Sequence, residues 1–491
     1  MRMRNLQGLC DSMPIMLYNT LTRSKEELKP VNDNALNIFV CGLTPYDDAH
    51  MGHAKTFVDF DVIVRWLRHR GYKVRYVQNI TDIEDKIINR ARERGIEPVE
   101  LERHYEKRFM DDMEALWARQ AVDLFPRSTD YIEAMRSQIQ LLLDKGYAYQ
   151  LEQDVYYDVS KFKDYTKLSG MRIEELEKHR IELRQGKRNP YDFALWKGAK
   201  EGEPSWKITL RIDGRDTEFV GRPGWHIEDT AMTHEIFGPQ YDIHGGASEL
   251  IFPHHSNEIA QAEAAFGVKP FVRYWLHTGI VNINNAKMSK SLGNFVTIRE
   301  VVARYGAEAV RMLCATTHYS KEMNYTDALI LDARKRNAYM YSALSIFYGM
   351  REAEAEGADD AALRTRVALF VVQFGEAMDD NFNTPLALSR LMAMIGELRV
   401  FAGTHSQVSA SVKAYALSSV LELAQTLGIL TSDAYKHTMP AEAGELVRRR
   451  EALRKDGRFN EADALRSELR KRFGIALEDT EYGSAWYFAG A

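Results

Sequence analysis

The sequence predicts an α/β fold in which a parallel sheet is interrupted by an insertion and followed by a long helical region. A short apolar run at 35–42 ends in glycine, as a buried parallel strand often does, and precedes a turn-rich loop at 43–53. An amphipathic pattern follows at 54–69, and residues 72–80 alternate like a second strand. A strand, a crossover helix and a parallel strand form a unit that binds ligands at the carboxyl ends of its strands.

Later segments complete the predicted organisation. Residues 81–150 have a helical and highly charged pattern, and short strand patterns with Gly- and Pro-containing turns fill 151–225. This middle region indicates an insertion. Strand signals return at 241–245 and 271–277 around a helical pattern at 256–266, and helical spacing dominates after Ala307. We therefore divide the chain into an extension (1–16), a sheet domain in two halves (17–110 and 226–325), a connective insertion (111–225), a helical bundle (326–430) and a small carboxy-terminal unit (444–491).

Composition excludes several classes of protein. The 491 residues carry 65 Lys and Arg against 70 Asp and Glu, a net charge of −5, so any nucleic-acid contact must come from a local basic patch. Three cysteines are too few for a disulfide framework, which favours a reducing compartment. No apolar run approaches the roughly 18 residues of a membrane span, and the first residues lack the apolar core of a secretion signal. We expect a cytoplasmic protein that does not bind membranes.

Two short motifs carry the clearest chemistry. His50, Gly52 and His53 form an H-x-G-H pattern at the start of the first crossover helix, where free N–H groups and the helix dipole attract phosphate. Lys287 and Lys290 lie in the loop KMSKSLGN, where mobile ammonium groups can bind an anionic leaving group. A surface histidine pair and a solvated basic loop are the ordinary alternatives. The order of the two motifs, on either side of the predicted sheet, is much more specific than either motif by itself.

HMGH and KMSKS in these places resemble the two signature motifs of class I aminoacyl-tRNA synthetases. The strings CGLTPYDDAHMGH, NITDIEDKII, GWHIED, DIHGGASELIFPHHSNEIAQ and AKMSKSLGN resemble the cysteinyl-tRNA synthetase family, and the resemblance runs from Tyr18 to Trp486. It implies a Rossmann-type nucleotide-binding domain that condenses L-cysteine with ATP, accompanied by Mg²⁺, to an adenylate and pyrophosphate. The cysteinyl group is then transferred to the 3′ adenosine of the cysteine tRNA with release of AMP. We expect a monomer.

The resemblance also implies roles for single residues. His50 and His53 would stabilise the α-phosphate, while Lys287 and Lys290 would hold the departing pyrophosphate. Thr81 and Trp225 match positions that line the cysteine pocket, although Trp225 could equally belong to the core. The residues implied to contact ATP are Gly52, His244, Gly245, Gly246, Met288, Ser289 and Lys290.

A metal site is implied with one departure from the family. The family binds one zinc per chain, usually through two cysteines, a histidine and a glutamate, and zinc accepts the cysteine thiolate. The matching residues are Cys41, Asp229, His254 and Glu258, with aspartate where cysteine is usual. His254 and Glu258 lie four residues apart on one helix face, which suits two ligands of one metal.

Three interpretations of Asp229 stay open. Aspartate is itself a zinc ligand, and with one thiolate fewer the metal would be a stronger Lewis acid, bound less tightly or replaced by another divalent ion. Alternatively, zinc is absent and Asp229 hydrogen-bonds the substrate ammonium or a neighbour, or the amino-acid specificity has changed. Cys41 by itself could be a small buried apolar residue, and His254 with its neighbouring histidine a capped helix start.

The carboxyl end resembles a tRNA-binding region. The bundle at 326–430 resembles the family's anticodon-stem domain. Residues 445–473 hold ten Lys and Arg against six Asp and Glu, although a solvated amphipathic helix would look similar. Family positions that read splayed anticodon bases are matched by Arg454, Phe459, Asp463 and Asp479, with Phe459 where tryptophan is more typical.

Two rival functions remain at this point. A cysteine ligase that acts on an amino-sugar pseudodisaccharide uses the same catalytic domain but lacks the long tail, so 326–491 speaks against it. A paralogue with altered amino-acid specificity, or one that binds tRNA without catalysis, is suggested only by Asp229. Intact HMGH and KMSKS motifs disfavour the second rival.

Overall fold

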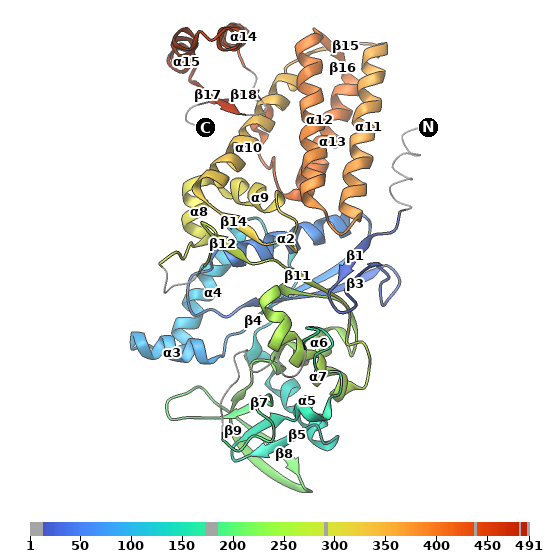
Figure 1. Ribbon diagram of the computed structural model, residues 1–491, viewed down its shortest axis with the longest axis vertical. Helices are drawn as coiled ribbons and strands as arrows, with labels where there is room; N and C mark the ends of the chain where they lie inside the picture. The colour runs from blue at the N-terminus through green and yellow to red at the C-terminus, as the bar shows by residue number, and fades with distance from the viewer. Residues whose placement is uncertain (1–12, 172–184, 289–292, 437–438, 481–482, 489–491) are drawn as a thin grey trace.

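The computed structural model describes residues 13–171, 185–288, 293–436, 439–480 and 483–488. Figure 1 shows a central sheet domain, with the insertion at one end of the molecule and the helical bundle and carboxy-terminal unit at the other. Among the described helices, none combines the length and the apolar composition that crossing a lipid bilayer requires.

The central sheet has four parallel strands in the order β11-β10-β3-β4. They are β3 (Ala35–Leu43), β4 (Lys73–Ile80), β10 (Tyr241–Ala247) and β11 (Val272–Thr278). The chain runs outward from β3 to β4 in one direction and from β10 to β11 in the other. The boundary between β3 and β10 is therefore the topological switch point where such sheets bind ligands. The predicted α/β class with a parallel sheet split by an insertion is confirmed.

Three helices flank the switch point. They are α2 (Met51–His69), α6 (Ile227–Phe237) and α7 (Ser256–Phe266), and α7 has the predicted bounds. Helix α2 begins before the predicted Ala54, because the ring of His50 caps it: His50 Nδ1 accepts from the backbone N–H groups of Gly52 and His53 across 3.1 and 3.4 Å. The H-x-G-H motif is thus the first turn of the crossover helix.

The segment between β4 and α6, which contains the predicted insertion at 111–225, begins with helices and ends in a separate antiparallel sheet. Its helices are α3 (Asp85–Arg94), α4 (Pro98–Ala115) and α5 (Ile132–Asp144). The sheet has the order β5-β6-β7-β9-β8. Its strands are β5 (Ala148–Leu151), β6 (Asp154–Tyr157), β7 (Phe193–Gly198), β8 (Trp206–Ile212) and β9 (Arg215–Pro223). Strand β9 leads directly to Trp225 and α6, so the insertion sheet borders the switch point.

A small sheet and two helices follow β11. They are β12 (Val281–Ile283), β13 (Ala286–Lys287), β14 (Met323–Tyr325), α8 (Ile298–Tyr305) and α9 (Ala307–Ala315). A hairpin near the amino terminus, β1 (Met16–Asn19) and β2 (Ser24–Glu27), is tied to β11, because Asn19 Nδ2 donates to the carbonyl of Arg273 across 2.9 Å. Lys287, the first residue of KMSKS, is the last residue of β13.

The rest of the chain is helical up to a final hairpin. Its elements are α10 (Asp327–Tyr348), β15 (Arg351–Ala353), α11 (Ala358–Asp379), α12 (Thr384–Thr404), β16 (Gln407–Ser409), α13 (Ala410–Leu427), α14 (Ala441–Lys455), α15 (Phe459–Phe473), β17 (Ile475–Thr480) and β18 (Gly483–Phe488). Helices α10 to α13 share one apolar core with α2 and the sheet. Helix α10 contacts α8 and α9 near one end and β17 and β18 toward the other, so it joins the sheet domain to the carboxy-terminal unit.

Candidate active site

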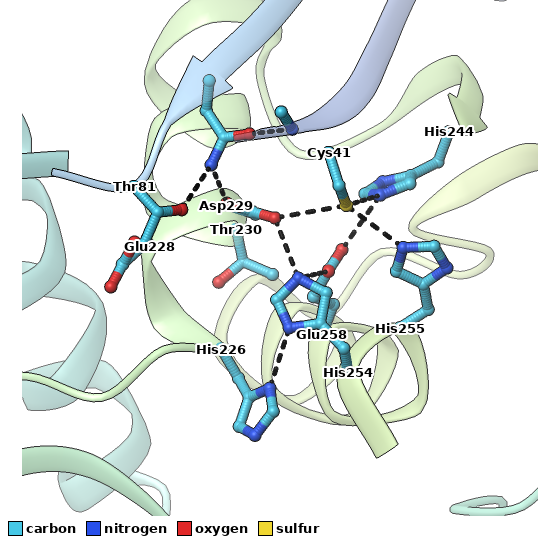
Figure 2. Close-up of polar contacts among 12 residues, drawn as sticks. Cys41, Thr81, His226, Glu228, Asp229, Thr230, His244, His254, His255 and Glu258 are labelled. Carbon is cyan, nitrogen blue, oxygen red and sulfur yellow. Dashed lines mark hydrogen bonds and ion pairs between the residues drawn. The ribbon is translucent and has the colours of Figure 1, made fainter. Parts of the chain in front are cut away.

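A cluster of polar side chains lies at the carboxyl end of the sheet, beside the boundary between β3 and β10. Cys41 comes from the end of β3, Asp229 from α6 and Glu258 from α7, while His254 comes from the short helical segment η6 (Ile251–His255) that runs into α7. Figure 2 shows these four side chains pointing toward one another. The structure therefore brings the four residues of the predicted ligand set together.

His254 is central to this cluster. Its Nε2 lies 3.0 Å from Asp229 Oδ2 and 2.9 Å from Glu258 Oε1. The Cys41 thiol donates to the same Asp229 oxygen across 3.5 Å. One imidazole nitrogen therefore faces both carboxylates at once.

Two residues of the GWHIED string hold the other side of His254. The indole ring of Trp225 stacks on the imidazole, with centroids 4.3 Å apart, and His226 Nδ1 lies 2.9 Å from His254 Nδ1. Trp225 is half-buried, so it covers the cluster without being part of the central core. The orientation of His254 is thus fixed from both nitrogens and from one ring face.

Two further histidines face Cys41. His255 Nε2 lies 3.1 Å and His244 Nε2 3.4 Å from Cys41 Sγ, and both histidines are fully buried. Sequence reasoning gave His255 no role and assigned His244 to ATP, but His244 Nδ1 lies 2.5 Å from the hydroxyl of Tyr241 and its ring belongs to the cluster. The doublet in PHHSNE was the available signal for His255, yet a doublet does not tell which ring faces inward.

Asn79 orients Asp229 from the neighbouring strand. Its Nδ2 donates to Asp229 Oδ1 across 2.8 Å and to Thr81 Oγ1 across 3.3 Å, while its Oδ1 accepts from the backbone of Gly42 across 2.7 Å. No sequence pattern singled out Asn79. Because the amide occupies Oδ1, the other oxygen of Asp229 is the one that faces Cys41 and the histidine.

The donor set fits a divalent metal. The ligand atoms of Cys41, His254, His255 and Glu258 all lie within 4.8 Å of one another. Both Glu258 oxygens are buried, and within the described part of the chain neither accepts a hydrogen bond of ordinary geometry. Thiolate, imidazole and carboxylate are the ligands that zinc takes in proteins. With Asp229 added, the cluster offers five donors for the four positions of a tetrahedral site.

The electrostatics of the cluster also favour a cation. Burial raises the pKa of the Cys41 thiol, and Asp229 and Glu258 raise it further. Burial raises the pKa of Glu258 to about 7, although His254 opposes this. Burial would lower the pKa of His254, but Glu258 and Asp229 raise it to about 10. Over the described ranges, neither carboxylate has a lysine or arginine partner, and His254, whose pKa is raised, is the cationic neighbour that faces both of them.

The two histidines of H-x-G-H are fixed by their own backbone. Besides the capping bonds of His50, His53 Nδ1 accepts from the backbone N–H of His50 across 3.2 Å, and the two rings stack with centroids 3.8 Å apart. Burial lowers the pKa of His53, and the charges of His50 and Lys86 lower it further. A neutral imidazole that accepts at Nδ1 carries its proton on Nε2, so each ring presents an Nε2–H donor.

The second motif lies close to the first. A Cβ atom on Gly52 would stand 2.9 Å from the His50 ring and 3.6 Å from Met288 Cε, so glycine leaves room for the cap and Met288 reaches the helix start. Lys287 Nζ makes an exposed ion pair with Glu249 at 2.5 Å. The predicted residues Ser289 and Lys290 lie outside the described residues.

The two glycines of the DIHGGASEL string are packing positions. A Cβ on Gly245 would lie 2.1 Å from the ring of Phe60 in α2, and one on Gly246 would lie 3.0 Å from His255. Glycine at these two positions therefore allows β10 to pack closely against Phe60 of α2 and against His255. Their predicted contact with adenosine is not needed to explain them.

Three of the four predicted anticodon residues lie together in the carboxy-terminal unit. Arg454 lies 3.3 Å from Asp479, and its guanidinium stands 5.6 Å from the ring centre of Phe459, which is 56% exposed. Asp463 is exposed one turn along α15 from Phe459. Sequence reasoning missed Arg450, which is fully buried and donates to both Asp479 oxygens at 2.6 Å.

Comparisons with known proteins bear on the whole chain. Residues 27–335 match the family model for the tRNA synthetases class I (C) catalytic domain, residues 373–431 the DALR domain, and residues 436–486 the cysteinyl-tRNA ligase anticodon binding domain. The cysteine–tRNA ligase of Thermococcus gammatolerans is 43% identical over 484 residues, and that of Pyrococcus abyssi 44% over 491 residues. Each alignment covers 96% of this chain and 99% of the relative.

Solved structures agree at the level of fold. Mycobacterium tuberculosis methionyl-tRNA synthetase in complex with methionyl-adenylate superposes with a TM-score of 0.57 at 17% identity. The match covers 80% of this chain and 89% of that one. The two chains therefore share their overall fold.

Proposed function

The chain belongs to the cysteinyl-tRNA ligase family, and we infer from this that it activates L-cysteine with ATP and transfers it to the cysteine tRNA. The observation that carries this function is identity of 43–44% to cysteine–tRNA ligases over nearly the full length of both chains. The amino-sugar ligase is disfavoured, because the chain includes a matched anticodon-binding domain.

We propose that the H-x-G-H histidines act on the α-phosphate of ATP. The cysteine carboxylate attacks the α-phosphorus and pyrophosphate leaves, so negative charge shifts to the oxygens around that atom. His50 and His53 would donate from Nε2 to these oxygens, because each Nδ1 already accepts a backbone N–H. Such catalysis consists mainly of positioning and charge stabilisation.

The KMSKS lysines would hold the leaving group. Lys287 must exchange its exposed partner Glu249 for pyrophosphate, and Lys290 is proposed as the second cation on resemblance. As ATP contacts we retain Gly52, Met288 and Ser289. His244 is reassigned to the metal cluster, because it is fully buried against Cys41.

We propose that Cys41, Asp229, His254 and Glu258 hold one zinc ion, with His255 as the alternative fourth donor. When bound, zinc supplies a thiol-seeking Lewis acid that distinguishes cysteine from serine. Thr81 and Trp225 would border the substrate, because Thr81 bonds Asn79 beside Asp229 and Trp225 stacks on the histidine.

At the other end of the molecule, we propose that Phe459 stacks on an anticodon base while Arg454, Asp463 and Asp479 contact base edges or backbone. We also propose that the enzyme acts as a monomer in the cytoplasm. Light scattering coupled to size-exclusion chromatography tests the monomeric state, and the mass of a dimer would contradict it.

The decisive experiment is amino-acid-dependent ATP–pyrophosphate exchange with cysteine, serine, threonine, alanine and aspartate, with and without added zinc. We expect exchange with cysteine alone. Exchange with another amino acid would mean that Asp229 changed the specificity, and no exchange with any of them would support a tRNA-binding paralogue.

Elemental analysis of protein purified without chelator tests the metal separately. We expect about one equivalent of zinc or another divalent transition metal. Less than about a tenth of an equivalent would contradict the metal proposal without affecting the family assignment.

A further inference from the structure

The first turn of α2 is bonded to the chain that follows the second motif. His50 and Thr297 form an isolated antiparallel bridge. The backbone N–H of Met51 donates to the carbonyl of Val296 across 3.0 Å, and a second backbone bond of 3.0 Å closes the bridge on its other side. Thr297 caps α8 and lies three residues after the string KMSKSLGN. The start of the H-x-G-H helix and the start of α8 therefore form one structural unit.

Asp48 makes a second connection through its side chain, two residues before His50. Its carboxylate oxygens accept from Nε and Nη2 of Arg108 in α4, across 2.5 and 2.8 Å. Nε of Arg299, the second residue of α8, lies 3.6 Å from Asp48 Oδ1. One carboxylate in the loop before α2 therefore faces a guanidinium group from each of two other helices.

The two arginines are themselves joined. Arg299 Nη2 donates to the backbone carbonyl of Arg108 across 2.9 Å and lies 3.1 Å from Oδ1 of Asp112, a buried residue of α4. Helices α4 and α8 also contact each other (Figure 1). We call Asp48, Arg108, Asp112 and Arg299 the Asp48 network. Its two carboxylates and two guanidinium groups balance in charge.

The exposure of the Asp48 network suits orientation more than stability. The side chains of Asp48, Arg108 and Arg299 are 22%, 32% and 30% exposed, and ion pairs that solvent reaches contribute little to the stability of a fold. A bidentate pair between arginine and carboxylate nevertheless fixes the relative orientation of its partners. The segment oriented here is the loop that ends in His50, whose ring caps α2.

The proposed reaction depends on this orientation. His50 and His53 are assigned above to the oxygens of the α-phosphate, and displacement of a catalytic group by about 1 Å can lower a rate about 100-fold. Asp47 is held separately, because Arg90 of α3 donates to it across 2.7 Å. The loop is thus fixed to α3 by one carboxylate and to α4 and α8 by the next, Asp48.

We propose that Asp48 is a positioning residue for adenylate formation. It holds the start of α2 against α4 and α8, and thereby places the Nε2–H groups of His50 and His53 where negative charge develops on the α-phosphate. Asp48 acts through these histidines and not on the substrate. This inference rests on the proposed function, because it requires that the two imidazoles act on ATP.

The first test is Asp48→Asn in the full-length enzyme, because the amide keeps the size of the side chain but loses its charge and one acceptor. We expect kcat of cysteine-dependent ATP–pyrophosphate exchange to fall about 10- to 100-fold, with the zinc content and the KM for cysteine unchanged. An unaltered kcat, or a loss confined to KM, would overturn the proposal.

Glu356→Gln is the matched control. Glu356 pairs with Arg364 through two bonds of 3.1 and 2.6 Å, and the two side chains are 32% and 23% exposed. This pair has the same bidentate form but lies in the helical bundle, beside the start of α11. Exchange should therefore stay unchanged in Glu356→Gln.

Arg108→Met removes the same contact from the side of α4. It should also lower kcat, and the double variant with Asp48→Asn should be no slower than Asp48→Asn, since both substitutions remove one contact. Losses that multiply in the double variant would overturn the proposal. Thermal unfolding is measured for each variant, and a rate loss matched by a large fall in unfolding temperature in both single variants would also overturn it.

A cycle with the capping histidine tests whether Asp48 acts through it. His50→Asn keeps a side-chain oxygen that can cap α2 but lacks the imidazole Nε2–H. In this background Asp48→Asn should lower exchange only about threefold or less, because His50 and His53 act on one phosphate as a unit. A full 10- to 100-fold loss in this background would overturn the proposal. Failure of the proposed function would appear separately, as wild-type enzyme without cysteine-dependent exchange.

Discussion

Two acidic clusters in this molecule balance their charge in opposite ways. In the active-site cluster, the carboxylates of Asp229 and Glu258 face a thiol and histidines but no lysine or arginine among the described residues. In the carboxy-terminal unit, Asp479 is held by Arg450 through two bonds of 2.6 Å and lies 3.3 Å from Arg454.

The pKa shifts follow this difference. Burial raises the pKa of Glu258 to about 7, whereas hydrogen bonds from Arg450 lower that of Asp479. Arginine neutralises the acidic cluster of the carboxy-terminal unit within the protein itself. The active-site cluster has the composition expected of a cation site, and the comparison can be tested from either side.

The largest effect is expected from Cys41→Ala. Loss of the thiolate should remove most of the bound metal and lower cysteine-dependent exchange by about 100-fold or more, beyond the 10- to 100-fold typical for residues that only support ligands. Metal content by elemental analysis and exchange rates measure this. Cys314→Ala is the control, because Cys314 is a fully buried thiol in α9 outside the cluster. An unchanged metal content in Cys41→Ala would contradict the proposal that the active-site cluster binds a metal through this thiol.

Substitutions of Asp229 test whether this carboxylate is one of the metal ligands. Asp229→Asn should weaken zinc binding by about 10- to 100-fold, while Asp229→Cys should strengthen it, because thiolate is the softer ligand. Competition with a chromophoric chelator measures both affinities. Asp242→Asn is the control, since Asp242 is a buried carboxylate on the same sheet that accepts from backbone N–H groups outside the cluster. Equal affinities in Asp229→Asn and wild type would leave His255 as the ligand.

The two clusters should respond differently to pH. Zinc affinity should rise by more than about tenfold per pH unit from pH 6 to 7, because the Cys41 thiol, Glu258 and His254, all with raised pKa values, must lose protons to bind metal. The ion pair of Asp479 should not change over this range. Its pKa is lowered, so its contribution is present above the ordinary carboxyl pKa and is lost only as pH falls through the folded value. Chelator competition and amide exchange in α14 at each pH measure the two responses, and a flat zinc affinity would contradict the first.

The smallest effect is expected from the exposed edge of the carboxy-terminal unit. Asp463→Ala should lower charging of the cysteine tRNA by about 5- to 10-fold through a lost base contact, with adenylate formation intact. Asp456→Ala removes an exposed carboxylate in the turn before α15 and serves as the control. Steady-state charging and ATP–pyrophosphate exchange measure the difference. Equal loss in both assays would argue against an anticodon role.

Much of the fold could be predicted because local patterns determine it. The buried strand at 35–42, the alternating strand at 72–80 and the helix at 256–266 correspond closely to β3, β4 and α7. The start of α2 was placed too late, because periodicity does not reveal that a histidine ring can cap a helix.

The site was predictable only as far as motifs and resemblance reach. Asn79, His255 and Arg450 carry no spacing signal, since their roles depend on which strands and helices become neighbours. Gly245 shows the converse, because a conspicuous glycine is explained by a close approach to Phe60 that only packing reveals. A residue that positions a ligand side chain of a different segment can be identified only from the three-dimensional structure.

Helix α10 connects the sheet domain to the carboxy-terminal unit, and its length has a consequence for tRNA selection. Its 22 residues span about 33 Å. Since an α-helix turns about 100° per residue, one inserted residue would swing the carboxy-terminal unit around the helix axis while moving it only about 1.5 Å. Seven inserted residues would nearly restore its direction but move it by about 10 Å. The distance and the angle between the sheet domain and the carboxy-terminal unit thus both depend on the residue count of this helix.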